Sequence, residues 1–344
     1  MAATQKERIV FDVAYQPQVR TNIDTPRLMS SVILALMPAV AVSVWQFGWR
    51  SLLMIAISVG SAVFFEWAYR KLLKKSATIG DCSAALTGLL LALTMPSSAP
   101  LWLPVIGTFF GIVVVKQIYG GIGKNFLNPA LAARAFLLAS YALYLGQFAV
   151  PSSLSGTVDG VSMATPLSFL YGGEALPGYF TLKTMFLGMR PGALGEVSAL
   201  ALLIGGLYLI IRKVISWRIP VSFLGTVALL TLIFGHEGYG HVDFMLYNLC
   251  SGGLLLAAIF MATDYATSPV TLNGQLLYGF GCGVLTVLIR YFGGYPEGVT
   301  YAILLMNLCT WAIDKGFRRH QFGVSKEDIE AEKAAKKAAK EAAK

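Results

Sequence analysis

The stretch DGVSMATPL, residues 159–167, combines the residue types of this chain that could do chemistry at a defined spacing. Asp159-Gly160 is a typical turn pair. Thr165 followed by Pro166 is typical of a helix N-cap and a first helical residue. The Thr165 hydroxyl is a weak nucleophile until a base or a metal activates it, so covalent chemistry there requires a separate enzyme. The residues by themselves therefore predict a turn and a capped helix.

Arg134 is the second candidate, because it follows Asn128-Pro129 by one or two helical turns within an apolar run. An ionisable side chain at membrane depth is costly and needs a partner. Either Arg134 binds an anionic or carbonyl-bearing group, or it pairs with backbone carbonyls that the proline break leaves free. The sequence leaves both alternatives open. Other ionisable residues lie nearer the ends of apolar runs, namely Glu66, Lys116, Asp243, Asp264 and Glu297.

Two further stretches look like motifs but lack the required residues. A nucleotide-binding P-loop would need glycine at Ile118 and Ser or Thr at Asn125. His236 and His241 are five residues apart, which does not place them on one helical face, so we predict a loop rather than a zinc site. The sequence predicts no catalytic side chain and no metal site.

The cysteines add no redox or metal chemistry. There are four, widely separated and without a C-x-x-C pair: Cys82, Cys250, Cys282 and Cys309. We expect buried, inert thiols.

The composition indicates the class of protein and therefore the kind of elements that position the candidate residues. Of 344 residues, 56% are hydrophobic and only 13% are charged, against roughly 25% charged in soluble domains. This excludes an ordinary soluble protein and predicts an all-α polytopic membrane protein, with the lipid bilayer as its surroundings. The formal charge of +9 comes from basic residues between apolar runs and in the tail, so we predict no nucleic-acid partner.

Apolar windows predict about ten transmembrane helices. Their ranges are 28–45, 51–69, 84–95, 101–119, 126–148, 194–211, 219–235, 243–262, 275–292 and 298–313. The third is only about 12 apolar residues long, too short to cross a bilayer unaided. Either this segment and its counterpart ending near Pro269 are broken helices around a site at the midplane, or both are ordinary helices with irregular ends.

The distribution of Lys and Arg predicts that both termini are cytoplasmic. The outer face would keep only Arg50, Lys183, Arg190 and Arg290. The chain then divides into a cytoplasmic N-terminal segment (1–26), a first membrane half (27–148), a periplasmic loop (149–193), a second membrane half (194–314) and a charged cytoplasmic tail (315–344).

An internal similarity relates the two membrane halves. TGLLLA at 87–92 is similar to GGLLLA at 252–257, and the motifs that follow are also related at a spacing of about 165 to 173 residues. Because five spans separate the copies, the second enters the membrane from the opposite side. The sequence predicts two inverted five-helix repeats.

Several longer stretches resemble a known family. They are DCSAALTGLL (81–90), KQIYGGIGKN (116–125), FLNPA (126–130) and FGGYPEGV (292–299). Together they resemble the D subunit of the Rnf (Rsx) electron transport complex. This D subunit is related to the B subunit of the sodium-translocating NADH:quinone reductase. The resemblance covers nearly the whole chain and implies a urea-transporter-like architecture.

The same resemblance gives the segment around Thr165 a second interpretation. Asp159, Gly160, Ser162, Ala164 and Thr165 match the motif on which a flavin transferase attaches FMN, with the phosphate esterified to the threonine. It also implies a second, noncovalent flavin near the cytoplasmic side, with riboflavin as one candidate. Arg134 is a further, weaker candidate for cofactor binding.

The family implies a membrane subunit of a redox-driven ion pump in the bacterial inner membrane. Its partners would be the other Rnf subunits (A, B, C, E and G), with electrons passing between ferredoxin and NAD and coupled to Na⁺ or H⁺ translocation. Such a chain is an electron-transfer subunit of a translocase and does not turn over alone. The alternative from another class is an inverted-repeat solute channel or secondary transporter, which would not need the motif at 159–165.

Overall fold

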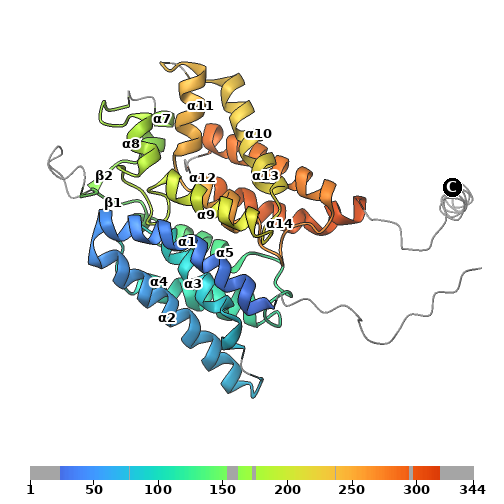
Figure 1. Ribbon diagram of the computed structural model, residues 1–344. Coiled ribbons are helices and arrows are strands. Elements are labelled where there is room, and N and C mark those ends of the chain that lie inside the picture. The colour runs from blue at the N-terminus through green and yellow to red at the C-terminus, as the bar shows by residue number, and fades with distance from the viewer. Residues whose placement is uncertain are drawn as a thin grey trace, which may run out of the picture.

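The computed structural model describes residues 24–76, 78–152, 162–172, 176–236, 238–293 and 297–317. Within these residues the chain is helical apart from one pair of two-residue strands (Figure 1). The all-α prediction is confirmed for this part of the chain. The N-terminal segment and the charged tail lie almost entirely outside the described residues.

The first membrane half consists of two long helices followed by shorter ones. Its elements are α1 (Thr25–Phe47), α2 (Trp49–Leu72), the 3₁₀ turn η1 (Ile79–Asp81), α3 (Ser83–Leu93), α4 (Leu103–Phe109), the π-helical η2 (Phe110–Gln117) and α5 (Pro129–Ser140). The expected short third helix is confirmed, because α3 has only 11 residues. Asn128 caps α5 by accepting a bond from the Ala130 amide at 3.0 Å, and Pro129 is the first helical residue.

The region between the halves is more structured than the expected loop. It contains α6 (Ala142–Leu145), the antiparallel strands β1 (Phe148–Ala149) and β2 (Ser162–Met163), and the short helices α7 (Pro166–Gly172) and α8 (Leu182–Leu187). The helix expected over 126–148 is also shorter than predicted. Tyr141 leaves helical geometry (φ −134°, ψ 39°), so α5 ends at Ser140.

The second half begins with α9 (Ala199–Ile211) and α10 (Arg218–Phe234) and ends with α13 (Leu272–Phe292) and α14 (Val299–Gly316). Between them lie α11 (His241–Cys250), α12 (Leu254–Leu256) and the π-helical η3 (Ala257–Met261). The chain bends by 64° between α11 and the α12–η3 segment. A broken helix was one of the two alternatives here, but the bend lies at 251–253, ahead of the position that the sequence indicated.

Helix lengths set a lower bound on the number of membrane crossings. In the described residues, α1, α2 and α13 are each long and apolar enough to cross a membrane. If the bent pair of α11 and the α12–η3 segment is counted as one span, the number of such spans rises to four. The shorter apolar helices are α3, α4 with η2, α5, α9 and α10. Each of the ten predicted ranges contains a helix, but most of these helices are shorter than a full span.

Packing joins the two halves along two seams (Figure 1). One is formed by α1 and α9, and the other by α5 and α14. Gly205 of α9 lies so close to α1 that a β-carbon there would overlap the carbonyl oxygen of Ala35. Small residues at helix contacts allow such close approach in membrane proteins, where packing rather than hydrophobic burial drives association.

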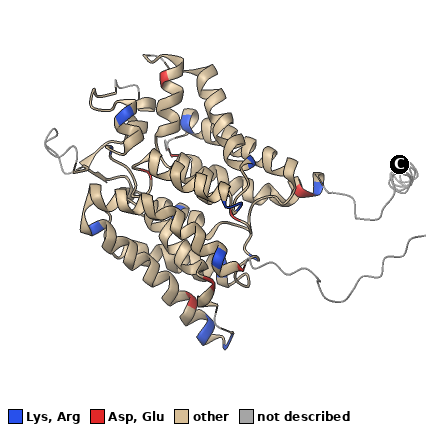
Figure 2. Ribbon diagram, viewed as in Figure 1, with Lys and Arg blue, Asp and Glu red and all other residues tan. Residues whose placement is uncertain are grey.

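The outer surface of the helices is apolar. Large side chains such as Leu52, Leu207, Ile233, Leu288 and Trp311 are exposed, and long stretches of the helices carry no charged residue (Figure 2). An apolar surface of this extent suits lipid rather than water. The chain is therefore a membrane-embedded helical protein.

Candidate functional site

Thr165 occupies the position that the sequence predicted, directly before α7. Its hydroxyl accepts a bond from the Ser168 backbone amide at 3.4 Å and shares a 2.9 Å hydrogen bond with the Ser168 hydroxyl. The predicted N-cap is confirmed. Ser162 and Ala164 are exposed, whereas Thr165 is only 6% exposed. Asp159 and Gly160 lie outside the described residues.

A cavity of about 170 Å³ lies beside the Thr165 side chain. Its polar lining comes from Thr165 and Ser168 next to and within α7, and from Glu297 and Tyr301 near and within α14. The remaining lining is apolar, from Leu138, Ala142, Leu145, Gly146 and Phe148. Tertiary packing therefore brings the predicted flavin site against the end of α5 and the start of α14, a neighbourhood that the sequence did not indicate.

Arg134 pairs with two carboxylates rather than with backbone carbonyls. Both of its terminal nitrogens lie 3.3 Å from Glu196 Oε1, and Nη2 also donates to Glu297 Oε2. Arg134 and Glu196 are buried, and the Glu297 side chain is 19% exposed. The alternative that Arg134 is held by carbonyls freed at the proline break is wrong. Since Glu297 also lines the cavity next to Thr165, the two candidates belong to one region.

Two more arginines surround this ion-pair cluster. Arg190 donates to the backbone carbonyls of Glu196 and Val197, and Arg290 donates to Asn248 Oδ1 at 3.1 Å. Both are 2% exposed, although the sequence analysis counted them among the charges of the outer face. Three buried arginines thus surround two glutamates, which leaves one excess positive charge beside the Thr165 cavity.

A helix-end tyrosine links this cluster to α7. Tyr171 donates a 2.7 Å hydrogen bond to Asn248 Oδ1, the atom that also accepts from Arg290. Burial raises the pKa of the Tyr171 phenol, so it stays a neutral hydrogen-bond donor at physiological pH.

Sequence reasoning missed Glu196 and the burial of the two arginines. Glu196 was visible as the single acidic residue within the predicted span 194–211. An acidic and a basic side chain that both lie in apolar runs are expected to form an ion pair, because an unpaired charge is costly at membrane depth. That signal could have paired Glu196 with Arg134.

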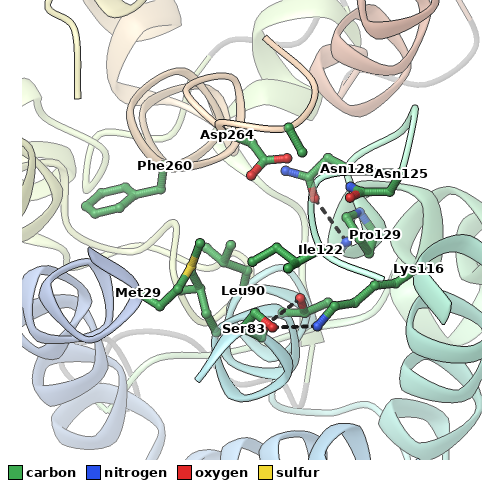
Figure 3. Close-up of a pocket in the computed structure, with 14 residues that line it drawn as sticks. Met29, Ser83, Leu90, Lys116, Ile122, Asn125, Asn128, Pro129, Phe260 and Asp264 are labelled. Carbon is green, nitrogen blue, oxygen red and sulfur yellow. Dashed lines mark hydrogen bonds between the residues drawn. The ribbon is translucent and has the colours of Figure 1, made fainter. Parts of the chain in front are cut away.

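A second polar site lies near the start of α1, at the other end of that helix from α7 (Figure 1). It is a hollow lined by side chains that include Ser83, Lys116, Asn125, Asn128 and Asp264 (Figure 3). Apolar residues such as Met29, Leu90 and Phe260 complete its wall. The Asn128 side chain also donates to the Met261 carbonyl at 3.1 Å, which joins the first half to the second at this site.

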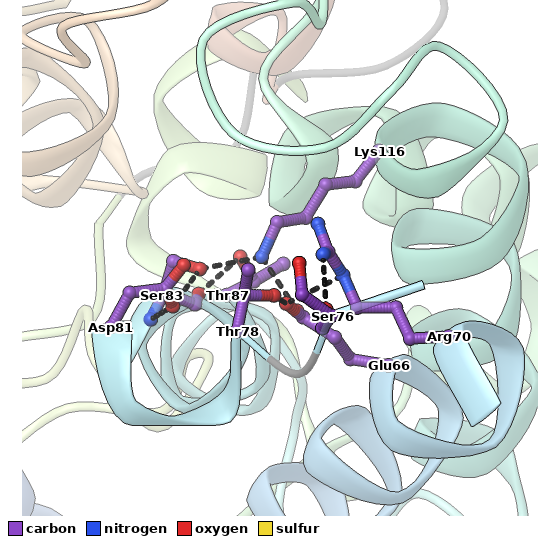
Figure 4. Close-up of polar contacts among 8 residues, drawn as sticks. All are labelled: Glu66, Arg70, Ser76, Thr78, Asp81, Ser83, Thr87 and Lys116. Carbon is purple, nitrogen blue, oxygen red and sulfur yellow. Dashed lines mark hydrogen bonds and ion pairs between the residues drawn. The ribbon is translucent and has the colours of Figure 1, made fainter. Parts of the chain in front are cut away.

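Lys116 beside this hollow is buried in an ion pair (Figure 4). Its ammonium lies 2.7 Å from Glu66 Oε2 and 2.6 Å from Ser83 Oγ. Thr78 donates to the other oxygen of Glu66, and Ser83 donates to Asp81. The network runs from α2 to η2 and α3. Lys116 is therefore not a solvated cytoplasmic charge of the kind on which the topology prediction depends.

The remaining candidates line neither the Thr165 cavity nor the hollow at Lys116. His236 lies between α10 and α11 as a loop residue, and His241 Nδ1 contacts the Leu232 carbonyl at 2.9 Å. Among the described residues no cluster of His, Cys, Asp and Glu could hold a metal ion. The cysteines are free, but only Cys282 is buried and Cys309 is exposed, which corrects the expectation of four buried thiols.

Comparison with known proteins places these features in a family. Residues 12–323 match the model of the NQR2, RnfD, RnfE family. The D subunit of the sodium-translocating ferredoxin:NAD⁺ oxidoreductase complex of Acetobacterium woodii is 47% identical, over 93% of this chain and 97% of that protein. The D subunit of the proton-translocating complex of Clostridium ljungdahlii is 42% identical, over 94% and 99%.

A third relative comes from Stutzerimonas stutzeri. The D subunit of the ion-translocating oxidoreductase complex of that organism is 38% identical, over 89% of this chain and 93% of the relative. Because the matches extend over most of both chains, the chain belongs to the NQR2, RnfD, RnfE family.

Proposed function

We propose that this chain is the membrane-embedded D subunit of an Rnf-type ion-translocating electron transport complex and that Thr165 carries covalently bound FMN. The observation that carries the proposal is the position of Thr165. It ends the motif Ser162-Met163-Ala164-Thr165, caps α7 and lines a cavity, in a chain whose relatives are named as the D subunits of such complexes.

The residues around Thr165 fit a flavin. Phe148 and Tyr301 offer aromatic surface to the ring, and Glu297 can accept a hydrogen bond from a ring N–H. Arg134 pairs with the Glu297 carboxylate and holds it in place. Bound FMN would supply the electron transfer, which no side chain lining this cavity can provide.

The burial of Thr165 constrains when the flavin is attached. Only 6% of the Thr165 surface is exposed, which gives a flavin transferase little access to this residue while α7 is packed. Attachment therefore precedes the packing of α7, or α7 moves away while the transferase acts. The exposed Ser162 and Ala164 give that enzyme its first contacts.

We further propose that the hollow beside Lys116 receives the noncovalent flavin. The pyrimidine edge of a flavin alternates carbonyl oxygens with an N–H group, and side-chain amides complement that pattern. Asn125 supplies an amide there, whereas the Asn128 amide is bonded to the backbone of Ala130 and Met261. Phe260 and Leu90 supply apolar surface. The two flavins would then lie toward opposite faces of the membrane.

The proposed topology places both termini in the cytoplasm of a bacterium and α7 on the periplasmic side of the inner membrane. It is supported by the bias of Lys and Arg and by Figure 1, in which the start of α1 and the end of α14 lie away from α7. Two inverted repeats of five spans are supported by the seams, since α1 pairs with α9 and α5 with α14, the corresponding helices of each half.

The proposed partners are the remaining Rnf subunits and a flavin transferase. The sequence contains neither a nucleotide-binding loop nor a C-x-x-C pair, so in this proposal electrons enter from and leave to other subunits. The relatives are named for Na⁺ in one case and for protons in another, and either ion is compatible with this framework.

The test of the covalent site is in-gel fluorescence of the denatured chain after expression with an active flavin transferase. We expect a fluorescent wild-type band and a dark Thr165→Ala band. Ser168→Ala is the matched control, since it removes the neighbouring hydroxyl of the same cavity and should stay fluorescent. A dark wild-type band, with the transferase active on another substrate, would refute the flavin site and favour a transporter.

A further inference from the structure

A third cavity lies where α9 ends and α10 begins. It has a volume of about 530 Å³. Lys213, Ser216 and Arg218 line it from the connection and the start of α10, and Ser268 and Gln275 line it from the opposite wall. Neither flavin site uses these residues.

The lining of this cavity carries positive charge without compensation. No Asp or Glu contributes to it. Among the described residues, no carboxylate forms an ion pair with Lys213, Arg218 or the adjacent Arg212. Arg218 instead lies over the ring of Trp217, 5.3 Å from its centroid. A cavity lined with cations and hydroxyls suits a phosphate group.

Lys213 holds a strained backbone conformation at this site. The Val214 amide donates to the Leu209 carbonyl and the Lys213 amide to the Ile210 carbonyl, which closes the end of α9 in a Schellman motif. In a Schellman motif, the residue that follows the helix cap adopts the left-handed conformation and is usually glycine. Here that residue is Lys213, with a φ of 55°. A lysine therefore stands where the backbone favours glycine, and it lines the cavity.

The surroundings indicate a lipid as the source of the phosphate. Ile211 is 70% exposed and Trp217 is 50% exposed, next to the cavity. Exposed tryptophan beside basic residues is typical of the membrane–water boundary. Leu207 and Ile204 continue an exposed apolar surface along α9, on which an acyl chain can lie.

We propose that this cavity binds the phosphate headgroup of an anionic phospholipid on the cytoplasmic side. Lys213 and Arg218 would contact the phosphate, and Ser216 and Ser268 would donate hydrogen bonds to it. Basic pockets between membrane helices are known sites for anionic headgroups. The site is separate from the flavin chemistry, so either proposal can fail without the other.

The test measures lipid binding to the full chain, purified with its partner subunits in a neutral detergent. Native mass spectrometry would give the apparent affinity for dioleoylphosphatidylglycerol and for dioleoylphosphatidylcholine. We expect preferential retention of phosphatidylglycerol. Lys213→Gly should weaken its binding about fivefold, the effect of one basic residue at a membrane surface. Because glycine relieves the strained backbone, misfolding is not the expected result.

Lys74→Gly is the matched control. Lys74 also ends a helix in the left-handed conformation, with φ 51°, but does not line the cavity. Its replacement should leave the affinity unchanged within about twofold, well under the effect of one basic contact. An equal loss in both variants would overturn the site in favour of general surface attraction. Displacement of the lipid by millimolar inorganic phosphate would identify a free anion instead, and loss of a partner subunit in Lys213→Gly would identify a protein interface.

Discussion

At the scale of single residues, buried charges determine how this chain is held together. Arg134 is paired with Glu196 and Glu297, and Lys116 is paired with Glu66. A buried ion pair is weak evidence for net stability, but removal of one partner leaves an uncompensated charge and costs about 3–5 kcal/mol. The consequences of substitution therefore depend on which partner remains.

Arg134→Ala should destabilise the chain by about 3 kcal/mol or more, because it removes the side chain that pairs directly with both Glu196 and Glu297, whereas Arg190 donates to backbone carbonyls instead. Thermal unfolding of the purified chain in detergent would measure the loss. Arg50→Ala is the control, since Arg50 is exposed and, in the part of the chain that the structure describes, donates to the carbonyls of Ser97, Ser98 and Ala99 rather than to a carboxylate. An unchanged transition in Arg134→Ala would contradict the paired arrangement.

The Lys116–Glu66 pair predicts a coupling between two substitutions. Lys116→Met and Glu66→Gln should each lower stability by a few kcal/mol, whereas the double variant should lose less than their sum, because neither partner of this pair then remains without the other. Arg70, which lies 4.0 Å from Glu66 Oε1, is 12% exposed and keeps contact with solvent. A double-mutant cycle on thermal unfolding measures this interaction. Strict additivity of the two effects would show that the pair contributes no coupling.

Asn125 provides a test of the second flavin. Asn125→Ala removes an amide from the hollow and should lower the amount of flavin released on denaturation, while the covalent fluorescence at Thr165 stays. Asn273→Ala is the control, because Asn273 is exposed and does not line the hollow. Equal flavin release from wild type and Asn125→Ala would remove Asn125 from that site.

At the scale of helices, close contacts at small residues set the spacing between neighbouring helices. Gly205 lets α9 approach the backbone of α1 at Ala35. Gly279 and Gly283 of α13 do the same for α10, where added β-carbons would lie 2.8 Å from the Ile219 carbonyl oxygen and 2.6 Å from Thr226 Cβ. These contacts require glycine for its size, since their neighbours are largely backbone atoms.

Gly205→Ala should therefore push α1 and α9 apart and cost about 1–3 kcal/mol, the usual effect of overpacking. Thermal unfolding in detergent gives the measurement. Gly225→Ala in α10 is the matched control, because no atom lies within 4 Å of the added β-carbon and alanine favours a helix. A Gly205→Ala variant as stable as Gly225→Ala would show that the contact between α1 and α9 tolerates a methyl group.

At the scale of the whole molecule, the two ends of the helical bundle carry different features. The Thr165 cavity belongs to one end, whereas the hollow at Lys116 and the basic cavity at Lys213 belong to the other. A subunit that relays electrons across a membrane needs a cofactor toward each face. The arrangement supports the proposed function without requiring any catalytic side chain.

The orientation can be tested by labelling introduced cysteines in intact cells with a membrane-impermeant maleimide. Lys183→Cys in α8 should react, because it is exposed on the proposed periplasmic side. Lys315→Cys at the end of α14 is equally exposed but should react only after the cells are opened. The exposed native Cys309 is first replaced by serine. Labelling with the reverse pattern would invert the topology.

The sequence by itself determined the features that depend on neighbouring residues. Apolar runs located a helix in every expected range, the short α3 followed from its few apolar residues, and Thr165-Pro166 located the start of α7. Helices and caps form between residues a few positions apart, so local composition predicts them. The motifs were likewise enough to indicate the family.

Only the tertiary structure decided which distant residues meet. Arg134 finds Glu196 and Glu297 at separations of 62 and 163 residues, and Arg190 and Arg290 become buried around them. The bend at 251–253 and the early end of α5 also went unpredicted. Burial and pairing depend on how helices pack against one another, so the neighbours of Arg134 in the sequence do not reveal that its carboxylate partners lie in the second half of the chain.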